Sequence, residues 1–597
     1  MKIRNILLAT ILLIAGLGEA YAVRAKGGYQ LVTQSDGTQI EVMLCGDEWF
    51  NFFVTRDHVP LVLEDNGDFC YADAFGFGMK SSGVLAHEAD RRTHSEQMHV
   101  SSMAAVASVE PYAAAARKAA NARRVVLQPT NLRGKYRGLV ILVNFKDQDF
   151  ISPTPKEYFQ ALLNEEGFHD SSRAVGSVHD YFLAQSHGLF DVTFDVIGPV
   201  TVSDSCHQYK TSARVRDAFM PEVIKAIVDS VNFADYDWDG NGEVDNVVAV
   251  YAGYGRNEYN SSNEKTAKAK DSIWPMEWEL STTLKYDNMN ISTFAVSNEL
   301  SVATDEVAGI GTLCHEFSHC LGLADLYDTV DIPSNSDGGL MDSWELMDGG
   351  NYNEAGWCPP NYSAFERIYC GWVEPTVLTA DTTVTDMPAL ADADVAYKVV
   401  NKTQYVNIDE YYLLENRQQK GWDQSVPSHG LVIWHIDFNA AVWRNNRPNA
   451  DVNHLRCMAF AADNDPLAHY EKRRKKMTGI PYPYIDKEGK VNNQLTDTST
   501  PAATVFTGPE ITGNKMGKPI MNITESEDGL ISFQFYSSNT AGISTVATDK
   551  PQTAAAYTLG GQRASTSQLN PAAGARVSQR GMIIVKGTDG KTKKVIR

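Results

Sequence analysis

The sequence is poor in cysteine and in basic residues. Eight cysteines are spread over 597 residues, too few for the disulfide-dense scaffold of a small secreted domain. Lysine and arginine number 53 against 74 aspartates and glutamates, which gives a formal net charge of −21. Because binding to nucleic-acid phosphates requires a basic surface, this charge argues against nucleic acid as the main partner. Beyond the N-terminus the chain also lacks apolar runs of the roughly 20 residues that span a bilayer, so we expect no transmembrane helix.

The remaining composition is that of a folded chain with several domains. Hydrophobic residues make up 43% of the sequence and aromatic residues 10%, which excludes wholesale disorder. At about 150 residues per domain, the length predicts roughly three or four units.

The N-terminus has the pattern of a secretory signal peptide. Lys2 and Arg4 precede an apolar stretch at residues 6–15, and Ala20-Tyr21-Ala22 forms a small-x-small cleavage site. The stretch is shorter than a membrane anchor needs. We therefore expect cleavage before Val23 and export of the chain to the extracellular space or the outer-membrane surface.

Composition changes several times along the chain. Residues 28–82 alternate apolar and polar positions between turn signals, which predicts a β-rich region. An Ala-rich stretch at residues 104–122 ends in Arg123-Arg124 and is predicted to be an exposed helical linker and processing site. Strand patterns dominate again from about residue 376, and a Ser/Thr/Ala/Gly-rich linker follows residue 536.

The region between these β-rich parts mixes strand and helix patterns. The apolar run at residues 138–145 predicts a strand that is buried on both faces. A helix-compatible segment begins near Thr304 and Asp305. We further expect helices at residues 158–164, 178–185 and 221–231, and strands at residues 192–196 and 247–251.

The strongest chemical signal is the segment that contains His315, Glu316 and His319. On a helix, two histidines four residues apart project from one face, so both imidazoles can reach one Zn²⁺. Glu316 would lie beside the metal, where it can polarise a water molecule and accept its proton.

Two imidazoles leave a catalytic zinc site one protein ligand short. Gly322 can adopt a positive φ and end the helix, after which Asp325 can return as the third ligand. The short histidine motif arises by chance in many sequences, but the added glycine and aspartate make it more specific. Glu345 is an alternative third ligand of the gluzincin type.

A second element lies downstream at residues 343–350. Met347 occupies a glycine-bounded turn and could form an apolar floor beneath the metal, although this turn taken alone is better explained by a core methionine. Tyr352 follows soon after and is a candidate to stabilise an oxyanion, with a structural tyrosine as the alternative.

Together these motifs resemble those of the immune-inhibitor-A-like (M6) metallopeptidases within the metzincins. The resemblance rests on the zinc motif with Asp325 as third ligand and on Met347 as the Met-turn. It is supported by residues 361–372, which look like the helix after that turn, and by residues 176–182 and 430–437. Only the zinc motif is highly specific.

This resemblance covers residues 28–537 and implies a secreted zinc endopeptidase, made as a zymogen, that acts on proteins and peptides. The implied fold is an α/β zincin (metzincin-like) catalytic domain with an N-terminal propeptide and a C-terminal all-β, sandwich-like domain. The expected layout is a signal peptide at 1–22, a propeptide at 23–124, the peptidase domain at 125–375, the β-sandwich-like domain at 376–537, and a linker and tail at 538–597.

Latency of an open zinc site requires a group that displaces its water. Cys45 and Asp47 offer a thiolate and a carboxylate for this role, while ordinary turn residues are the alternative. A catalytically inactive zincin-fold adhesion protein is the rival function, but a module kept only for binding would not need Glu316.

An acidic loop resembles a calcium site. Its candidate oxygen ligands alternate along the chain, and Gly242 permits a sharp turn. Val248 stands where an EF-hand has its glutamate, so the loop is not an EF-hand. The candidate Ca²⁺ ligands are Asp237, Asp239, Asn241, Glu243 and Asp245.

The C-terminal tail resembles the sorting domains of type IX secretion substrates. The resemblance rests on residues 557–563 and 581–586 and on the basic end of the chain. It implies an export machinery that reads the tail as a partner. A small β-hairpin with a basic end is the alternative.

Overall fold

The computed structural model describes most of the chain between Val23 and Asn539 and three strands beyond it. The described residues are 23–48, 51–75, 78–104, 131–170, 173–259, 266–329, 340–401, 409–451, 453–465, 477–507, 513–539, 553–558, 582–587 and 592–596. The predicted signal peptide, most of the Ala-rich linker and Arg123-Arg124 lie outside them. Residues 1–537 form one compact unit and residues 538–597 a second. Among the described residues, no helix has the length and apolarity needed to cross a bilayer.

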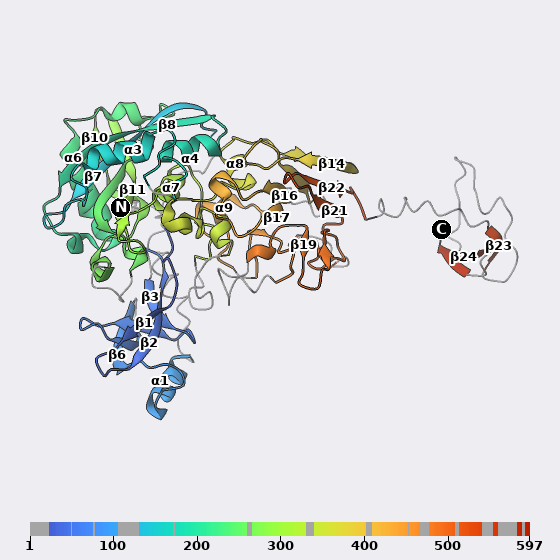
Figure 1. Ribbon diagram of the computed structural model, residues 1–597, viewed down its shortest axis with the longest axis horizontal. Coiled ribbons are helices and arrows are strands. Elements are labelled where there is room, and N and C mark those ends of the chain that lie inside the picture. The colour runs from blue at the N-terminus through green and yellow to red at the C-terminus, as the bar shows by residue number, and fades with distance from the viewer. Residues whose placement is uncertain are drawn as a thin grey trace, which may run out of the picture. The chain divides into compact units, whose positions relative to one another are not determined.

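The first element of the larger unit is an antiparallel meander, which we call the N-terminal lobe (Figure 1). Its strands pair in chain order because each short turn returns the chain beside the strand that it has just left. A helix, α1 (His94–Ala104), follows the sheet. The strands are β1 (Gln30–Thr33), β2 (Gln39–Gly46), β3 (Asn51–Thr55), β4 (Pro60–Leu63), β5 (Phe69–Phe75) and β6 (Gly78–Leu85).

The central part is built on a mixed sheet with the order β10-β11-β9-β7-β8. Strand β7 pairs in parallel with β8 and β9, β9 pairs in parallel with β11, and β10 is antiparallel to β11. A two-residue strand, β12 (Glu306–Val307), pairs with the end of β11. The other strands are β7 (Gly134–Asn144), β8 (Phe190–Thr201), β9 (Val248–Tyr254), β10 (Met276–Tyr286) and β11 (Met289–Ser301).

Helices cover both faces of this sheet. Val140 and Leu142 of β7 belong to one hydrophobic cluster with residues of the three helices α3, α4 and α7. The alternate residues Leu139, Ile141 and Val143 belong to a second cluster with α6 and the N-terminal lobe. Period-two alternation thus buries β7 on both faces, as its apolar run predicted. The helices are α3 (Pro155–Asn164), α4 (Val178–Gln185), the short α5 (Ser212–Arg214), α6 (Met220–Ile227) and α7 (Gly311–Cys320).

The helix expected to begin near Thr304 begins later. Asp305 has a φ of 60°, in the left-handed region, and Val307 pairs with Leu300 as part of β12. Because this strand pairing takes the backbone out of helical geometry, α7 starts only at Gly311. The predicted start was therefore wrong.

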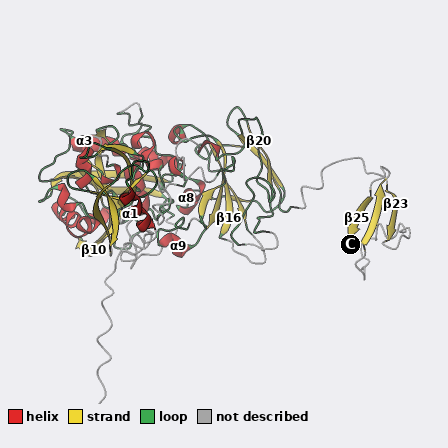
Figure 2. Cartoon of the chain, turned by 90° about the horizontal axis from the view of Figure 1, so that it is seen from below, coloured by secondary structure: helices red, strands yellow, loops and turns green. Residues whose placement is uncertain are grey.

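Two further sheets follow α8 (Ala364–Tyr369), with the short α9 (Ala440–Arg444) between their strands (Figure 2). The larger sheet has the order β13-β15-β16-β17-β18 and the smaller has the order β14-β22-β21. These strands are β13 (Thr376–Val377), β14 (Thr382–Met387), β15 (Tyr397–Val400), β16 (Glu410–Arg417), β17 (Gly430–Asp437), β18 (Cys457–Ala459), β21 (Ile520–Glu525) and β22 (Ile531–Phe535), and a separate hairpin joins β19 (Tyr484–Ile485) to β20 (Val491–Asn492).

Strand β16 shows how the larger sheet is packed. Tyr411 and Leu413 lie in the hydrophobic cluster that contains the helices α4 and α7. Tyr412 and Leu414 point to the other face and share a cluster with β21 and β22. The sheet is therefore packed against the central part on one face and against the smaller sheet on the other.

The second unit contains a three-stranded antiparallel sheet of β23 (Thr553–Thr558), β24 (Met582–Gly587) and β25 (Thr592–Ile596). Strand β23 includes the first two residues of the motif at 557–563, and β24 includes residues 582–586 of the second motif.

Candidate metal centre

Helix α7 brings the three residues of the zinc motif into the interior. His315, Glu316 and His319 have no exposed surface. The two imidazole rings lie on one face of the helix, with centroids 4.8 Å apart and planes at 85°. The spacing of four residues therefore places both rings toward the same point, as predicted.

The end of α7 orients the second histidine. Gly322 has a φ of 91°, and Leu323 N donates to the Ser318 carbonyl at 3.2 Å. This is the hydrogen bond of a Schellman cap, which needs a residue that tolerates the left-handed conformation. The turn directs the Leu323 carbonyl back to His319 Nδ1, at 2.8 Å.

Asp325 returns to the helix and completes a group that can bind a metal ion. Its Oδ1 lies 3.1 Å from His315 Nε2 and 3.4 Å from His319 Nε2. Ligand atoms about 2.0–2.1 Å from a tetrahedral zinc are separated by about 3.3–3.4 Å, so the three side chains fit that ion. They form one of the two groups of potential metal ligands found among the described residues.

Hydrogen bonds on the far side fix the protonation of both rings. His315 Nδ1 lies 2.8 Å from the Leu346 carbonyl, and His319 Nδ1 has the corresponding contact with Leu323. A carbonyl can only accept, so each Nδ1 carries the proton and each Nε2 presents its lone pair toward Asp325.

The charge states also suit a metal site. Burial would raise the pKa of Asp325, but the adjacent imidazoles of His319 and His315, when they are protonated, outweigh burial and lower this pKa. Burial lowers the pKa of His319. Because zinc binds carboxylates and neutral imidazoles, both shifts favour the forms that coordinate it.

Asn446 holds Asp325 from outside the motif. Its Nδ2 donates to Asp325 Oδ2 at 2.5 Å, and its Oδ1 accepts from the Asp325 backbone nitrogen at 2.7 Å. Asn446 follows α9 and is 121 residues away in sequence. No local pattern could have indicated this contact.

Glu316 lies on the same helix but contacts a different part of the chain. Its Oε1 accepts a hydrogen bond from the backbone nitrogen of Val23 at 2.9 Å. Burial raises the pKa of Glu316 well above its usual value, an effect that the hydrogen bond from Val23 opposes and the negative charge of Asp325 reinforces. The segment that precedes the N-terminal lobe therefore reaches the candidate general base.

The predicted turn is connected by hydrogen bonds to residues of the zinc motif and its surroundings. Met347 is fully buried, and its carbonyl accepts from Leu326 N at 2.8 Å. The preceding Leu346 supplies the carbonyl that orients His315. The turn thus connects the first histidine to the residue after Asp325.

Two other candidates near this turn have different surroundings. The Tyr352 hydroxyl donates to the carbonyl of Arg24 at 2.6 Å and accepts from Asn257 Nδ2 at 2.8 Å. Glu345 is buried, and both desolvation and the carboxyl of Glu366 raise its pKa well above the usual value. Glu345 is not in the metal-ligand group, in which Asp325 supplies the carboxylate.

The predicted switch residues lie in the N-terminal lobe beside the segment that reaches Glu316. Gly46, between Cys45 and Asp47, accepts a hydrogen bond from Ala25 N at 2.8 Å. Cys45 and Asp47 are buried, but neither belongs to the metal-ligand group of the described residues.

The acidic loop forms the second group of potential ligands. Carboxylate oxygens of Asp237, Asp239 and Asp245 lie within 4.8 Å of one another. Asp237 also accepts backbone hydrogen bonds from Gly240 and Gly242. Burial, together with the nearby carboxylates, raises the pKa of Asp245 to about 7.

Sequence reasoning missed two residues that contact the segment next to Glu316. The indole Nε1 of Trp274 donates to the Val23 carbonyl at 2.8 Å. Asp342 accepts from Arg24 Nη2 at 2.5 Å and has a φ of 44°. Aspartate adopts this left-handed region more readily than most residues, and φ is not readable from the sequence.

Comparison with known proteins agrees with this geometry. Residues 137–371 match the profile of the catalytic domain of the immune inhibitor A peptidases, family M6. This segment, which holds α7 and Met347, is similar to an M6 catalytic domain. We call it the M6 segment.

A curated relative supports the same assignment. Immune inhibitor A of Bacillus thuringiensis subsp. alesti is 25% identical over 279 residues. The alignment covers 38% of this chain and 38% of that protein, so the matched part spans well under half of the relative. The resemblance expected over residues 28–537 is thus matched by the family profile in the M6 segment.

Proposed function

We propose that the chain is a secreted, zinc-dependent endopeptidase that cleaves proteins and peptides and is made as a zymogen. The observation that carries this proposal is the convergence of His315, His319 and Asp325, with Glu316 on the same helix. The match of the M6 segment supports a metallopeptidase. The distances between the three ligand atoms support zinc as the metal.

A zinc ion bound at these ligands would polarise the scissile carbonyl and lower the pKa of a water molecule. Glu316 takes the proton from the attacking water at a carboxylate oxygen. It then delivers this proton to the nitrogen of the leaving amine, and the peptide C–N bond breaks. Leu346 and Leu323 keep the imidazoles in the tautomer that leaves Nε2 free for the metal.

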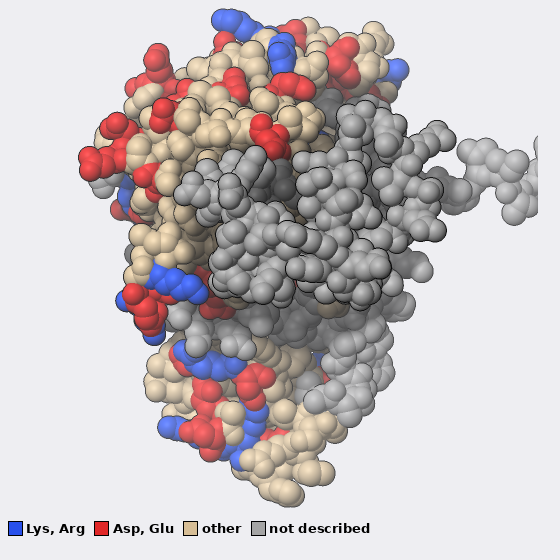
Figure 3. Space-filling model, turned by 90° about the vertical axis from the view of Figure 1, so that its right-hand side faces the viewer, with Lys and Arg blue, Asp and Glu red and all other residues tan. Residues whose placement is uncertain are grey.

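Further parts of the proposal concern stability and export. The acidic loop at Asp237, Asp239 and Asp245 is proposed to bind Ca²⁺, together with Asn241 and Glu243. The signal peptide and the tail are proposed to direct export to the cell surface or beyond. On the face in Figure 3, acidic and basic side chains of the described residues are interspersed.

An inactive zincin-fold binding protein is the rival proposal, and Glu316 separates the two. A general base typically contributes about 10²–10⁴-fold to the rate. We expect Glu316→Gln to lower casein cleavage by about this factor, without loss of bound zinc. Glu354→Gln, which alters an exposed glutamate close to the Met347 turn, is the matched control and should cleave like the wild type. Equal cleavage by Glu316→Gln would refute the mechanism.

A further inference from the structure

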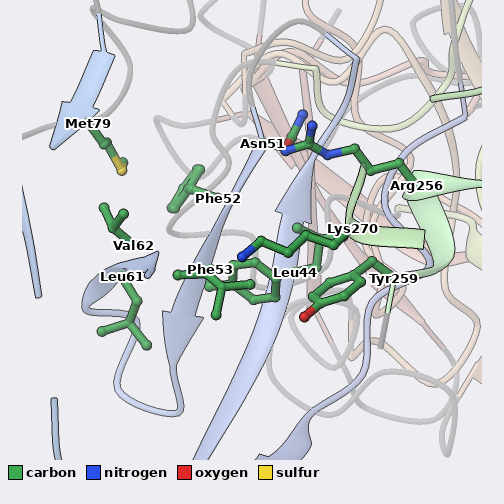
Figure 4. Close-up of a pocket in the computed structure, with 11 residues that line it drawn as sticks. Leu44, Asn51, Phe52, Phe53, Leu61, Val62, Met79, Arg256, Tyr259 and Lys270 are labelled. Atoms are coloured by element: carbon green, nitrogen blue, oxygen red, sulfur yellow. The ribbon is translucent and has the colours of Figure 1, made fainter. Parts of the chain in front are cut away.

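A pocket lies between the N-terminal lobe and the M6 segment, outside the metal centre (Figure 4). Its volume is about 250 Å³. The lobe contributes side chains of β2, β3, β4 and β6, and the M6 segment contributes Arg256, Tyr259 and Lys270. None of the described residues that line it belongs to either group of potential metal ligands.

The lobe gives this pocket apolar walls. Leu44, Phe53 and Leu61 belong to the hydrophobic cluster that the lobe shares with the central sheet. Phe52 and Met79 belong to a smaller cluster within the lobe. Members of both clusters line the pocket, so a ligand there would bury an apolar part against either side.

The M6 segment adds two cations to these walls. Figure 4 shows the side chains of Arg256 and Lys270 extending toward the strands of the lobe. Arg256 Nη2 donates to Asn51 Oδ1 at 3.3 Å, and Lys270 Nζ donates to the backbone carbonyl of Glu64 at 3.3 Å. Both acceptors are neutral. Within the described part of the chain, neither cation forms an ion pair, and no aspartate or glutamate lines the pocket.

The surroundings of Arg256 leave its charge poorly compensated. Burial lowers the pKa of Arg256, and the charge of Asp271 opposes this effect only in part. Asp271 is itself paired with Lys210 Nζ at 2.6 Å. Because a charge removed from water is costly unless it is paired, an anion in the pocket would be bound favourably.

The size and the backbone of the walls narrow the class of anion. A water molecule occupies about 30 Å³ of liquid, and a methylene group is of similar size, so the pocket holds about eight such groups. Strand β3 is paired with both β2 and β4, which occupies the backbone groups between these strands. A bound peptide would therefore leave amide groups without partners, whereas an aliphatic chain has none to satisfy.

We propose that this pocket binds an aliphatic monocarboxylate of about six to eight carbons, such as a short fatty acid. The carboxylate lies at Arg256 and Lys270, and the chain lies along Leu44, Phe53 and Leu61. The proposal is independent of the proposed function, because none of these residues takes part in peptide hydrolysis.

The first test compares small ligands by isothermal titration calorimetry. The full-length chain carrying Glu316→Gln is titrated with octanoate, which we expect to bind at millimolar or lower concentrations. Butanoate should bind on the order of 100-fold more weakly, since it lacks four methylene groups that the walls would bury. 1-Octanol should bind about tenfold or more weakly, since it lacks the charge.

Three outcomes of this titration would overturn the proposal. The first is the absence of octanoate binding at millimolar concentration. The second is inorganic phosphate that binds as tightly as octanoate, which would reveal a general anion site. The third is N-acetyl-leucine that binds more tightly than octanoate, which would assign the pocket to the C-terminal residue of a peptide.

The second test locates the ligand with variants. Arg256→Met and Lys270→Met should each weaken octanoate binding about tenfold or more, and Arg256→Lys should weaken it less than Arg256→Met. Lys225→Met, an exposed change on α6, is the matched control and should bind like the parent chain. Thermal unfolding without ligand verifies that each variant is folded.

Thermal unfolding with octanoate gives a second readout on the same proteins. A ligand that binds only the folded chain raises its melting temperature as the ligand concentration rises. This increase should appear in the parent chain and in Lys225→Met, and should shrink in Arg256→Met and Lys270→Met. Unchanged octanoate affinity in both of these pocket variants would overturn the proposal.

Discussion

The side chain of Asn446 forms hydrogen bonds with both the backbone nitrogen and the carboxylate of Asp325, although the two residues are 121 positions apart in the sequence. The contact leaves Asp325 Oδ1 facing the two imidazoles while Oδ2 is held from behind. A ligand oriented in this way loses less entropy when the ion binds. The region after the M6 segment thus contributes to the metal centre.

We predict that Asn446→Ala lowers zinc affinity about 10–100-fold, because Asp325 is then free to rotate away from His315 and His319. Competition with a fluorescent zinc chelator measures the effect. Asn445→Ala, a change at the exposed neighbour, should leave the affinity unaltered. Full affinity in Asn446→Ala would show that Asp325 needs no support.

The identity of the third ligand can be tested by metal content. Asp325→Ala should abolish stoichiometric zinc, because its oxygen is part of the group with His315 and His319. Glu345→Gln should retain zinc, since the buried Glu345 interacts with Glu366. Inductively coupled plasma mass spectrometry of the purified variants provides the measurement. The opposite pattern would favour the gluzincin-type ligand set.

The acidic loop predicts a calcium-dependent stability. If Ca²⁺ binds there, saturation at about 100 times its Kd adds about 2.7 kcal/mol to the free energy of unfolding. Asp239→Asn should remove most of this gain in thermal unfolding experiments with Ca²⁺ or a Ca²⁺-selective chelator. Asp229→Asn, at an exposed position after α6, should not. A melting temperature independent of Ca²⁺ in the wild type would exclude the site.

The N-terminal lobe should become less stable as the pH rises. His87 lies between Glu96 Oε1, at 2.6 Å, and Asp36 Oδ2, at 3.1 Å. Burial lowers the pKa of His87, but hydrogen bonds to and charges of Glu96 and Asp36 outweigh it and raise this pKa above the usual value. The stabilisation is complete below the unfolded pKa of about 6.5 and is lost as the pH passes the folded pKa.

We expect His87→Gln to reduce the pH-dependent part of the free energy of unfolding of the lobe by about 0.5–1 kcal/mol. The effect is this small because His87 and its carboxylate partners are partly exposed. This difference is measured by hydrogen exchange of the backbone amides of β5 at about pH 5.5 and at about pH 8.5. The two pH values lie on either side of an ordinary histidine pKa. His94→Gln, at an exposed position at the start of α1, is the control. Exchange rates in the wild type that do not change beyond the intrinsic pH effect would contradict the prediction.

Local patterns predicted much of the central fold. The apolar run of β7 and the helix of residues 178–185 were anticipated because burial on two faces and helical periodicity leave a mark on neighbouring residues. The start of α7 was not predicted correctly, because it depends on the pairing of Val307 with Leu300 in another strand. Local helical preference yielded there to a tertiary contact.

For the metal centre, the sequence alone determined the types of the candidate ligands and their spacing along the chain. Two histidines one helical turn apart and a glycine that ends the helix place His315, His319 and Asp325 together, because backbone geometry fixes their directions. Only the tertiary structure decided what surrounds them. Asn446 behind Asp325, Trp274 at the Val23 carbonyl and the acid pair around Arg24 come from distant segments, and folding brings such segments together by packing that no local pattern records.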